Sequence, residues 1–219
     1  RLQPLTNDTP KPLLIVGEKP IMEHNVDRLS LYGIDDYWFS VKYLGEQIQD
    51  FFGNGEVKNL SIEYVWEDKP LGTIGAVSKI NNFKHDHILL TNSDILTNLN
   101  YEDFYQDFIE KDADFSIVSI PYQVNIPYAV LEEGVDGCVK SFKEKPTYTY
   151  YSNGGIYLIK KAILDYIPRE TFFNATDLMD VLIAKNKKVI SYPFSGYWLD
   201  IGKHEDFRQA QIDLDKIKF

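Results

Sequence analysis

The sequence predicts an α/β fold, in which helices cover both faces of a doubly wound, mostly parallel sheet. Short apolar runs alternate with amphipathic segments along the chain, which is the pattern of strands joined by helical crossovers. The chain has 219 residues, and 44% of them are hydrophobic, enough to bury one large core or two modest ones. No repeat, low-complexity tract or linker divides it, so we expect a single domain over residues 1–219.

The first part of the chain is predicted to alternate helices and strands. Pro20 and Gly33 bracket the first helix, because proline suits the start of a helix and glycine its end. In the second helix, Ile48, Phe51 and Phe52 should face the core. The elements expected in this part are helices over residues 21–31, 44–52, 74–83 and 101–110 and strands over residues 36–41, 61–66, 88–91 and 115–120.

The remainder of the chain has a different pattern, because two short strands flank a glycine-containing turn. Gly134 and Gly137 lie between apolar runs over residues 128–132 and 138–142, an arrangement typical of a hairpin. We therefore expect a sheet that is Rossmann-like in its parallel half and mixed in the rest. The other elements expected here are strands over residues 155–159 and 189–192 and helices over residues 161–167, 176–185 and 205–217.

The composition excludes several classes of function. With 33 acidic and 23 basic residues the net charge is −10, which repels nucleic acid and anionic membrane surfaces, so neither is expected as a partner. Cys138 is the only cysteine, so the chain has neither a disulfide framework nor a thiolate metal site, as is usual in a reducing compartment. No apolar run approaches the roughly 20 residues of a membrane span, and no signal pattern opens the chain, so we expect a cytoplasmic location.

Two acidic residues stand where apolar strands end, which is the edge of an α/β sheet at which ligands bind. Asp94 follows the run from His87 to Ser93, and Asp200 lies in the apolar segment 197–202. If the two carboxylates converge, their oxygens suit Mg²⁺ and leave coordination positions for phosphate and water. The alternative is structural, with Asp94 as a turn residue and Asp200 as the cap of the helix that begins near His204.

Two further segments carry groups suited to phosphate and sugar. Gly72 and Thr73 lie where glycines open a predicted helix and let a ligand approach the backbone closely. Carboxylate and amide groups suit sugar hydroxyls and an ammonium group suits phosphate, which together describe Glu144, Lys145 and Asn153 beside Gly155. The alternative is again structural, because glycine and threonine are common at helix starts and a Glu-Lys pair is usually a surface feature.

Arg1 and Lys11 form a basic pair at the start of the chain and flank a proline-rich connector. In nucleotide-binding folds such a pair usually follows a buried strand and a glycine-rich turn. A solvated loop carries the same pair about as often. The pair therefore gains meaning only from the motifs that follow it.

Several motifs occur in a fixed order along the chain, and in that order they resemble one family. They are Arg1-Leu2-Gln3-Pro4-Leu5-Thr6, Pro10-Lys11-Pro12-Leu13-Leu14, Val16-Gly17-Glu18-Lys19-Pro20-Ile21, Pro70-Leu71-Gly72-Thr73, Asn92-Ser93-Asp94, Glu144-Lys145-Pro146, Asn153-Gly154-Gly155-Ile156-Tyr157 and Trp198-Leu199-Asp200-Ile201-Gly202. Together they resemble the sugar-1-phosphate nucleotidyltransferases, also called nucleotide-sugar pyrophosphorylases. The likeness covers essentially the whole chain.

The resemblance implies a transferase of nucleotide-sugar biosynthesis. A sugar 1-phosphate would attack the α-phosphorus of a nucleoside triphosphate, forming a nucleotide sugar and releasing pyrophosphate. Carried over residue by residue, the likeness implies that Arg1 and Lys11 contact the triphosphate, Gly72 and Thr73 lie against the base or ribose, Asp94 and Asp200 bind Mg²⁺ as cofactor, Lys145 holds the sugar phosphate, and Glu144, Asn153 and Gly155 complete the sugar-phosphate site.

Among the branches of the family, the likeness is strongest to the mannose-1-phosphate guanylyltransferase type. The shared features are segments 71–75 and 126–128 and a terminal helix without an appended β-solenoid. GTP is therefore the favoured nucleotide. Two departures affect the sugar side: Ser93 replaces the glycine usual before the aspartate, and Ala129 stands where a glycine is usual. Each adds a side chain beside a substrate.

Three other interpretations remain open. A nucleotide-sugar-dependent glycosyltransferase also ends a strand with a metal-binding acid, but Asn92-Ser93-Asp94 lacks the paired acids typical of that site. A catalytically silent regulatory subunit would keep the fold and lose the basic and metal-binding residues, which are intact here. A plain nucleotide-binding module would leave the sugar-side motifs unexplained.

The resemblance also raises an expectation about the segment ahead of Arg1. In the family, a strand and a glycine-rich loop come before this position, and that strand is central in the sheet. We therefore expect the natural polypeptide to extend upstream through a strand and a glycine-rich loop. A further N-terminal domain, which some relatives carry, is compatible with this expectation. Dimers and tetramers are frequent in the family, so a homo-oligomer is compatible with the likeness.

Overall fold

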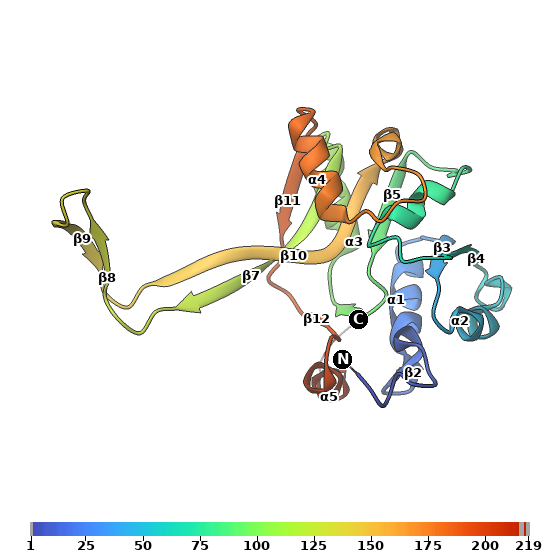
Figure 1. The fold of residues 1–219 in the computed structure, drawn as a ribbon. Coiled ribbons are helices and arrows are strands. Elements are labelled where there is room, and N and C mark those ends of the chain that lie inside the picture. Colours follow the sequence, from blue (N-terminus) through green and yellow to red (C-terminus); the bar gives the residue numbers. More distant parts are fainter. Residues whose placement is uncertain (1, 215–216, 218–219) are drawn as a thin grey trace.

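A computed structural model describes residues 2–214 and 217 of the chain. Figure 1 shows a body of sheets and helices from which one long β-ribbon projects. The elements, in chain order, are η1 (Lys11–Leu13), β1 (Ile15–Val16), β2 (Lys19–Pro20), α1 (Ile21–Ser30), β3 (Asp36–Val41), α2 (Gly45–Phe52), η2 (Glu56–Lys58), β4 (Ser61–Trp66), η3 (Gly75–Lys79), β5 (His87–Thr91), β6 (Ile95–Thr97), α3 (Tyr101–Glu110), β7 (Phe115–Asn125), β8 (Val130–Glu133), β9 (Val139–Lys143), β10 (Thr147–Lys160), η4 (Lys161–Tyr166), α4 (Ala175–Ala184), β11 (Val189–Pro193), β12 (Trp198–Asp200) and α5 (His204–Asp213), where η marks a 3₁₀ helix.

The central sheet has four strands in the order β11-β7-β10-β5. β11 runs parallel to β7, whereas β10 runs antiparallel to both β7 and β5. Successive side chains of β10 point to opposite faces, and both sets are buried: Ile156 and Leu158 pack with α1 and α3, while Tyr157 and Ile159 pack with η4 and α4. Helices therefore cover both faces of a mixed sheet, and the predicted α/β class is confirmed.

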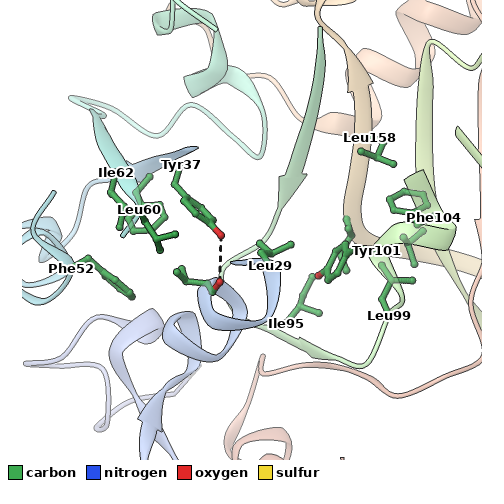
Figure 2. Packing of buried hydrophobic residues seen from close by; sticks show 14 of the residues in the cluster. Leu29, Tyr37, Phe52, Leu60, Ile62, Ile95, Leu99, Tyr101, Phe104 and Leu158 are labelled. Carbon is green, nitrogen blue, oxygen red and sulfur yellow. Dashed lines mark hydrogen bonds between the residues drawn. The ribbon is translucent and has the colours of Figure 1, made fainter. Parts of the chain in front are cut away.

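The larger core joins the sheet to the helices on one face. Figure 2 shows Leu29 of α1, Tyr37 of β3 and Leu158 of β10 among the side chains of this core. Phe104 of α3 is fully buried there. The Tyr37 hydroxyl lies 2.8 Å from the carbonyl of Ile34 and 3.3 Å from that of Val26, so a buried polar group is satisfied by backbone acceptors.

The sheet is interrupted between β3 and β5. Among the described residues, β3 pairs only with β4, in parallel, and β5 pairs only with β10. A cavity of about 810 Å³ separates the two strands and is lined by consecutive residues of each, 36–40 and 87–91, together with residues of α1 and η3. Because successive residues of a strand point to opposite faces, a lining of consecutive residues means that both strands turn their edges to the cavity. The strand expected upstream of Arg1 stays a prediction.

Several boundaries agree with the sequence and others do not. β3, β4 and α3 begin and end where the sequence predicts, and α1, α4 and β11 differ by a residue or so. The predicted helix over residues 74–83 is wrong, because only the 3₁₀ helix Gly75–Lys79 forms there, and in place of the helix predicted over residues 161–167 the 3₁₀ helix Lys161–Tyr166 forms. Both Ile74 and Gly75 donate their backbone N–H to the carbonyl of Phe173, which holds this segment to a distant loop.

Two details of the helices also need correction. Phe51 is 47% exposed, because the buried side of α2 is formed by the i, i+4 pair Ile48 and Phe52. α5 ends at Asp213, earlier than predicted, and residues 215 and 216 of the predicted helix lie outside the described residues. None of the helices in the described part of the chain has the length and apolar character needed to span a bilayer.

Candidate functional site

Lys11 and the two predicted acidic residues come together at one point of the body. The Lys11 ammonium donates a hydrogen bond to Asp94 and lies 3.9 Å from Oδ1 of Asp200. The side chains of Asp94 and Asp200 are 23% and 51% exposed, so a ligand can reach both carboxylates. These residues are more than eighty positions apart in sequence, and the fold brings them together.

A short antiparallel pair, which the sequence analysis missed, brings the two acids together. β5 ends at Thr91, the chain turns through residues 92–94, and β6 then pairs with β12 in a register that places Asp200 opposite Ile95. The backbone N–H of Ile201 also donates to the carbonyl of Asp94 at 3.0 Å. Leu96 of β6 is fully buried in a hydrophobic cluster with Ile201 and Ala210, which anchors the pair in the core. Backbone hydrogen bonding therefore holds Asp200 within β12 and Asp94 at the last residue of the turn before β6.

The alternative in which Asp200 caps the helix near His204 does not match the start of α5. There the backbone N–H groups of Gly202 and Lys203 donate to Asp206, at 3.2 and 2.9 Å. Asp206 thus occupies the position in the first turn where a carboxylate stabilises the helix. Asp200 lies before this turn, in β12, with its carboxylate toward Lys11.

A pocket of about 320 Å³ lies beside the acidic pair. Its lining includes residues predicted to bind the nucleotide and residues predicted to bind the sugar phosphate. Thr73, Asn153, Gly155 and Asp200 all line it. The sequence had assigned no role to the other lining residues, which are Asn92, Ile95, Tyr157, Asn174, Thr176 and Trp198. Two of these, Asn92 and Trp198, belong to the motifs that contain the aspartates.

Asn153 is held in one orientation by two donors. Its side-chain oxygen accepts a hydrogen bond from the backbone N–H of Gly155 at 2.8 Å and from the hydroxyl of Tyr157 at 2.9 Å. Burial raises the pKa of Tyr157, so this hydroxyl stays protonated and remains a donor. Since the oxygen of Asn153 is already used, its NH₂ group is the part available to a ligand hydroxyl or phosphate.

At Gly155, β10 contacts the turn that carries Asp94, because the N–H of Asn92 donates to the carbonyl of Gly155 at 3.0 Å. The register of β10 against β7 shifts between Asn153 and Tyr157, as in a β-bulge, and Gly155 has a φ of +70°. A Cβ on this residue would lie 2.7 Å from Nδ2 of Asn92 and 2.8 Å from Cδ1 of Ile95. Glycine is therefore required here by both conformation and space.

The loop with Gly72 and Thr73 is held to the segment that leads into α4, and its predicted contact with base or ribose stays a prediction. A Cβ on Gly72 would lie 2.6 Å from the carbonyl of Phe173, so its close neighbour is another loop of the protein. The hydroxyl of Thr73 accepts a hydrogen bond from the N–H of Ala175, the first residue of α4, at 2.9 Å. These residues join the loop to the start of α4, and the glycine makes that contact possible.

Glu144 and Lys145 do not lie with the other predicted residues. They follow β9 near the outer end of the projecting ribbon, which Figure 1 shows extending away from β12. Both side chains are exposed, and neither lines the pocket beside Asp200. Arg1 lies outside the described residues, so its predicted contact with triphosphate remains a prediction.

The donor set of the cluster suits a hard divalent cation. Asp94 and Asp200 supply carboxylate oxygens, and the single ammonium of Lys11 leaves the cluster with an excess of negative charge. Within the described residues, no group of three or more His, Cys, Asp or Glu side chains forms a metal cage. Mg²⁺ is usually held by one or two carboxylates together with substrate phosphates, so two acidic residues fit that ion without a cage.

Comparison with known proteins gives consistent matches along the chain. A family model described as "Nucleotidyl transferase" matches residues 1–217. The D-glycero-alpha-D-manno-heptose 1-phosphate guanylyltransferase of Aneurinibacillus thermoaerophilus is 30% identical over 98% of this chain and 93% of its own length. The UTP--glucose-1-phosphate uridylyltransferase of a Synechocystis strain is 28% identical over 96% of this chain and 59% of its own length.

A solved structure has the same arrangement of elements. The crystal structure of HddC from Yersinia pseudotuberculosis is 25% identical, covers 98% of this chain and 94% of that chain, and superposes with a TM-score of 0.74. The chain thus spans 59% of the uridylyltransferase that it matches and nearly all of the heptose 1-phosphate guanylyltransferase.

Proposed function

Because this chain belongs to the nucleotidyl transferase family, we propose that it transfers a nucleoside monophosphate from a nucleoside triphosphate to a sugar 1-phosphate. The products are a nucleotide sugar and pyrophosphate. The observation that carries the proposal is the convergence of Lys11, Asp94 and Asp200 beside a pocket lined by Thr73, Asn153 and Gly155. Cation, carboxylates and amide are the groups that two phosphorylated substrates require at one place.

The reaction requires little covalent chemistry from the protein. A phosphate oxygen of the sugar 1-phosphate attacks the α-phosphorus, the bond to the β-phosphate oxygen breaks, and pyrophosphate carries that electron pair away. Two polyanions must be brought together, so positioning and charge neutralisation supply the rate. Lys11 lies where it can place a positive charge on the triphosphate, and the NH₂ group of Asn153 can orient a sugar hydroxyl or phosphate oxygen.

Mg²⁺ is the cofactor proposed for this site, held by the carboxylates of Asp94 and Asp200. When bound, such an ion neutralises phosphate charge and fixes the geometry of the phosphates. Lys11 would then exchange its contact with Asp94 for a contact with phosphate. Its contacts with the two acids keep the ammonium close to where the phosphate groups would gain negative charge during the reaction.

GTP is proposed as the preferred nucleotide, and the relatives support this in part. The heptose 1-phosphate relative is named a guanylyltransferase, whereas the Synechocystis relative is named a uridylyltransferase. The base is therefore a matter for direct measurement.

The first experiment measures pyrophosphate release from the purified protein with Mg²⁺, a panel of nucleoside triphosphates and a panel of hexose, hexosamine and heptose 1-phosphates. Release above background that requires both substrates is expected, and it should be fastest with GTP. Asp94→Asn and Asp200→Asn should each lower turnover on the order of 100-fold, because each removes a charge from the cluster. The variant Asp50→Asn, which alters an exposed carboxylate on α2, is the control.

The outcomes separate the parts of the proposal. Silence across the whole panel contradicts the enzymatic assignment. Release with near-normal rates in both aspartate variants leaves the enzyme assignment in place and contradicts the assignment of the acidic pair.

A further inference from the structure

The helix α5 packs against residues 2–17, which carry Lys11 and are called the lysine segment below (Figure 1). The apolar contact is made within one buried cluster, which includes Ala210 of α5 and Leu2, Leu14 and Val16 of the lysine segment. Apolar burial is non-directional, so it holds the segment against the helix without fixing where Lys11 lies. Directional contacts between the two are therefore the ones that set the position of the lysine.

Gln211 of α5 supplies two such contacts, both to strand β1. Its Nε2 donates to the carbonyl of Ile15 at 2.7 Å, and its Oε1 accepts from the N–H of Gly17 at 2.9 Å. The N–H of Ile21 donates to the carbonyl of Leu14 from the β2 side, so the carbonyl of Ile15 points to the opposite edge of β1. Gln211 thus takes the place of a further strand on that edge and satisfies two backbone groups.

A short 3₁₀ helix connects this attachment to Lys11. The N–H of Leu14 donates to the carbonyl of Lys11 at 3.1 Å, which closes the turn of η1 directly before β1. A shift of Ile15 along α5 therefore moves Lys11 with it. Asp200 lies in β12, four residues before His204, the first residue of α5. The same helix is thus tied to the lysine and to one of the two acids.

His204 ties the other end of the lysine segment to α5. Its Nε2 lies 2.7 Å from the carbonyl oxygen of Gln3, and because a carbonyl only accepts, Nε2 carries the hydrogen. Between Gln3 and Lys11 the chain forms turns and bends, and the side chains of Tyr43 and Gln47 donate to carbonyls in the middle of this stretch. Side-chain donors from two helical regions therefore hold a loop that has no strand partner among the described residues.

We propose that Gln211 and His204 are positioning residues of the reaction, which hold the lysine segment so that the Lys11 ammonium meets the phosphates of the triphosphate. The inference rests on the proposed function, because it assigns to α5 the placement of a group that the proposed reaction uses. Neither side chain lines the pocket beside Asp200, so each acts through the backbone that it binds. Lys11 contacts Asp94 and lies 3.9 Å from Asp200, so a displacement of about 1 Å changes both contacts.

The first measurement is equilibrium binding of GTP with Mg²⁺ to the purified chain, without sugar 1-phosphate, by calorimetry. Gln211→Ala removes two hydrogen bonds and is expected to raise the dissociation constant about tenfold. The factor should be the same for every triphosphate that the wild type binds, because an ammonium recognises phosphate and not the base. In turnover, the KM for the triphosphate should rise similarly, while the KM for the sugar 1-phosphate changes less than about twofold.

Gln209→Ala is the matched control for Gln211→Ala. Gln209 lies on the same helix, and its side chain donates to Asp213 within α5 at 2.8 Å. The same chemical change is therefore made without loss of a bond to the lysine segment. Triphosphate binding by Gln209→Ala should equal that of the wild type.

Two further comparisons distinguish positioning from general stability. In a Lys11→Ala background, Gln211→Ala should change triphosphate binding less than about twofold, because the group that it positions has been removed. His204→Ala should weaken binding about threefold, the effect of one hydrogen bond. His204→Gln, whose Nε2 can reach the same carbonyl, should restore binding to nearly the wild-type value.

The remaining outcomes separate this inference from the proposed function. Unchanged binding by Gln211→Ala, or an equal loss with and without Lys11, shows that α5 does not act through the lysine. If Gln211→Ala does not fold by circular dichroism, the two His204 variants decide, and a loss that His204→Gln does not restore overturns the inference. If the wild type binds triphosphates but releases no pyrophosphate with any sugar 1-phosphate, the proposed function fails and the binding comparisons still decide the role of α5. A wild type that binds no triphosphate overturns both.

Discussion

At the scale of single residues, the candidate site depends on a few positions that tolerate one side chain only. Gly155 combines a φ of +70° with contacts to Asn92 and Ile95 that leave no room for a Cβ. Gly137, in the turn between β8 and β9, has a similar φ of +76°, but nothing lies within 4 Å of the position of its Cβ. The two glycines therefore share a conformational requirement and differ in the steric one.

Gly155→Ala is expected to destabilise the protein more than Gly137→Ala. Left-handed backbone costs about 1–2 kcal/mol for a residue with a Cβ, and both variants should show this loss in the free energy of unfolding. Gly155→Ala should lose on the order of 2 kcal/mol more, because the new methyl group overlaps buried neighbours. Urea unfolding of both variants measures the difference. Equal losses would mean that Asn92 and Ile95 move aside at little cost.

At the scale of elements, the hydrophobic pattern and the residues at helix ends predicted the helices and strands that are determined by residues close in sequence. Asp36–Val41 and Ser61–Trp66 were predictable to the residue, because alternating apolar side chains and flanking turns are sufficient for a half-buried strand. The segment 74–83 was not, since its course follows from hydrogen bonds to Phe173, a hundred positions away. β6 and β12 have three residues each, too few for any period to be visible.

The same contrast holds for the candidate site. The aspartates could be found from the sequence because each ends or interrupts an apolar run, and the structure brings them together. The roles of Asn92 and Trp198 were missed because a pocket lining is a property of the folded chain. The length of β10, which extends from Thr147 to Lys160, was also missed, and with it the separation of Glu144 and Lys145 from the pocket.

The free edge of β5 predicts an alternating pattern of hydrogen exchange. The N–H of Asn92 donates to the carbonyl of Gly155 in β10, so in this antiparallel pair the N–H of Leu90 also points to β10. The N–H of Leu89 then points to the cavity between β3 and β5. Leu89 should therefore exchange its amide proton at least about tenfold faster than Leu90, as measured by NMR. Equal protection of the two leucines would show that a further strand covers this edge.

At the scale of the whole molecule, the body and the projecting β-ribbon, residues 121–152, differ in how much apolar surface they bury. The body buries apolar residues on both faces of its sheet, and its fully buried side chains include Phe104, Phe108 and Phe115. The ribbon leaves Tyr128 and Phe142 in contact with water at 75% and 65% exposure. The stability of the chain should thus reside in the body.

Phe142→Ser is expected to leave the fold nearly as stable as before. The exposed ring contributes little within one chain, so the free energy of unfolding should change by less than about 0.5 kcal/mol. Phe108→Ser is the comparison, because Phe108 is a fully buried phenylalanine of α3, and loss of its ring should lower the free energy of unfolding by at least about 3 kcal/mol. Urea unfolding measures both variants, and a loss above about 1 kcal/mol for Phe142→Ser would show that the projecting ribbon contributes to the stability of the body.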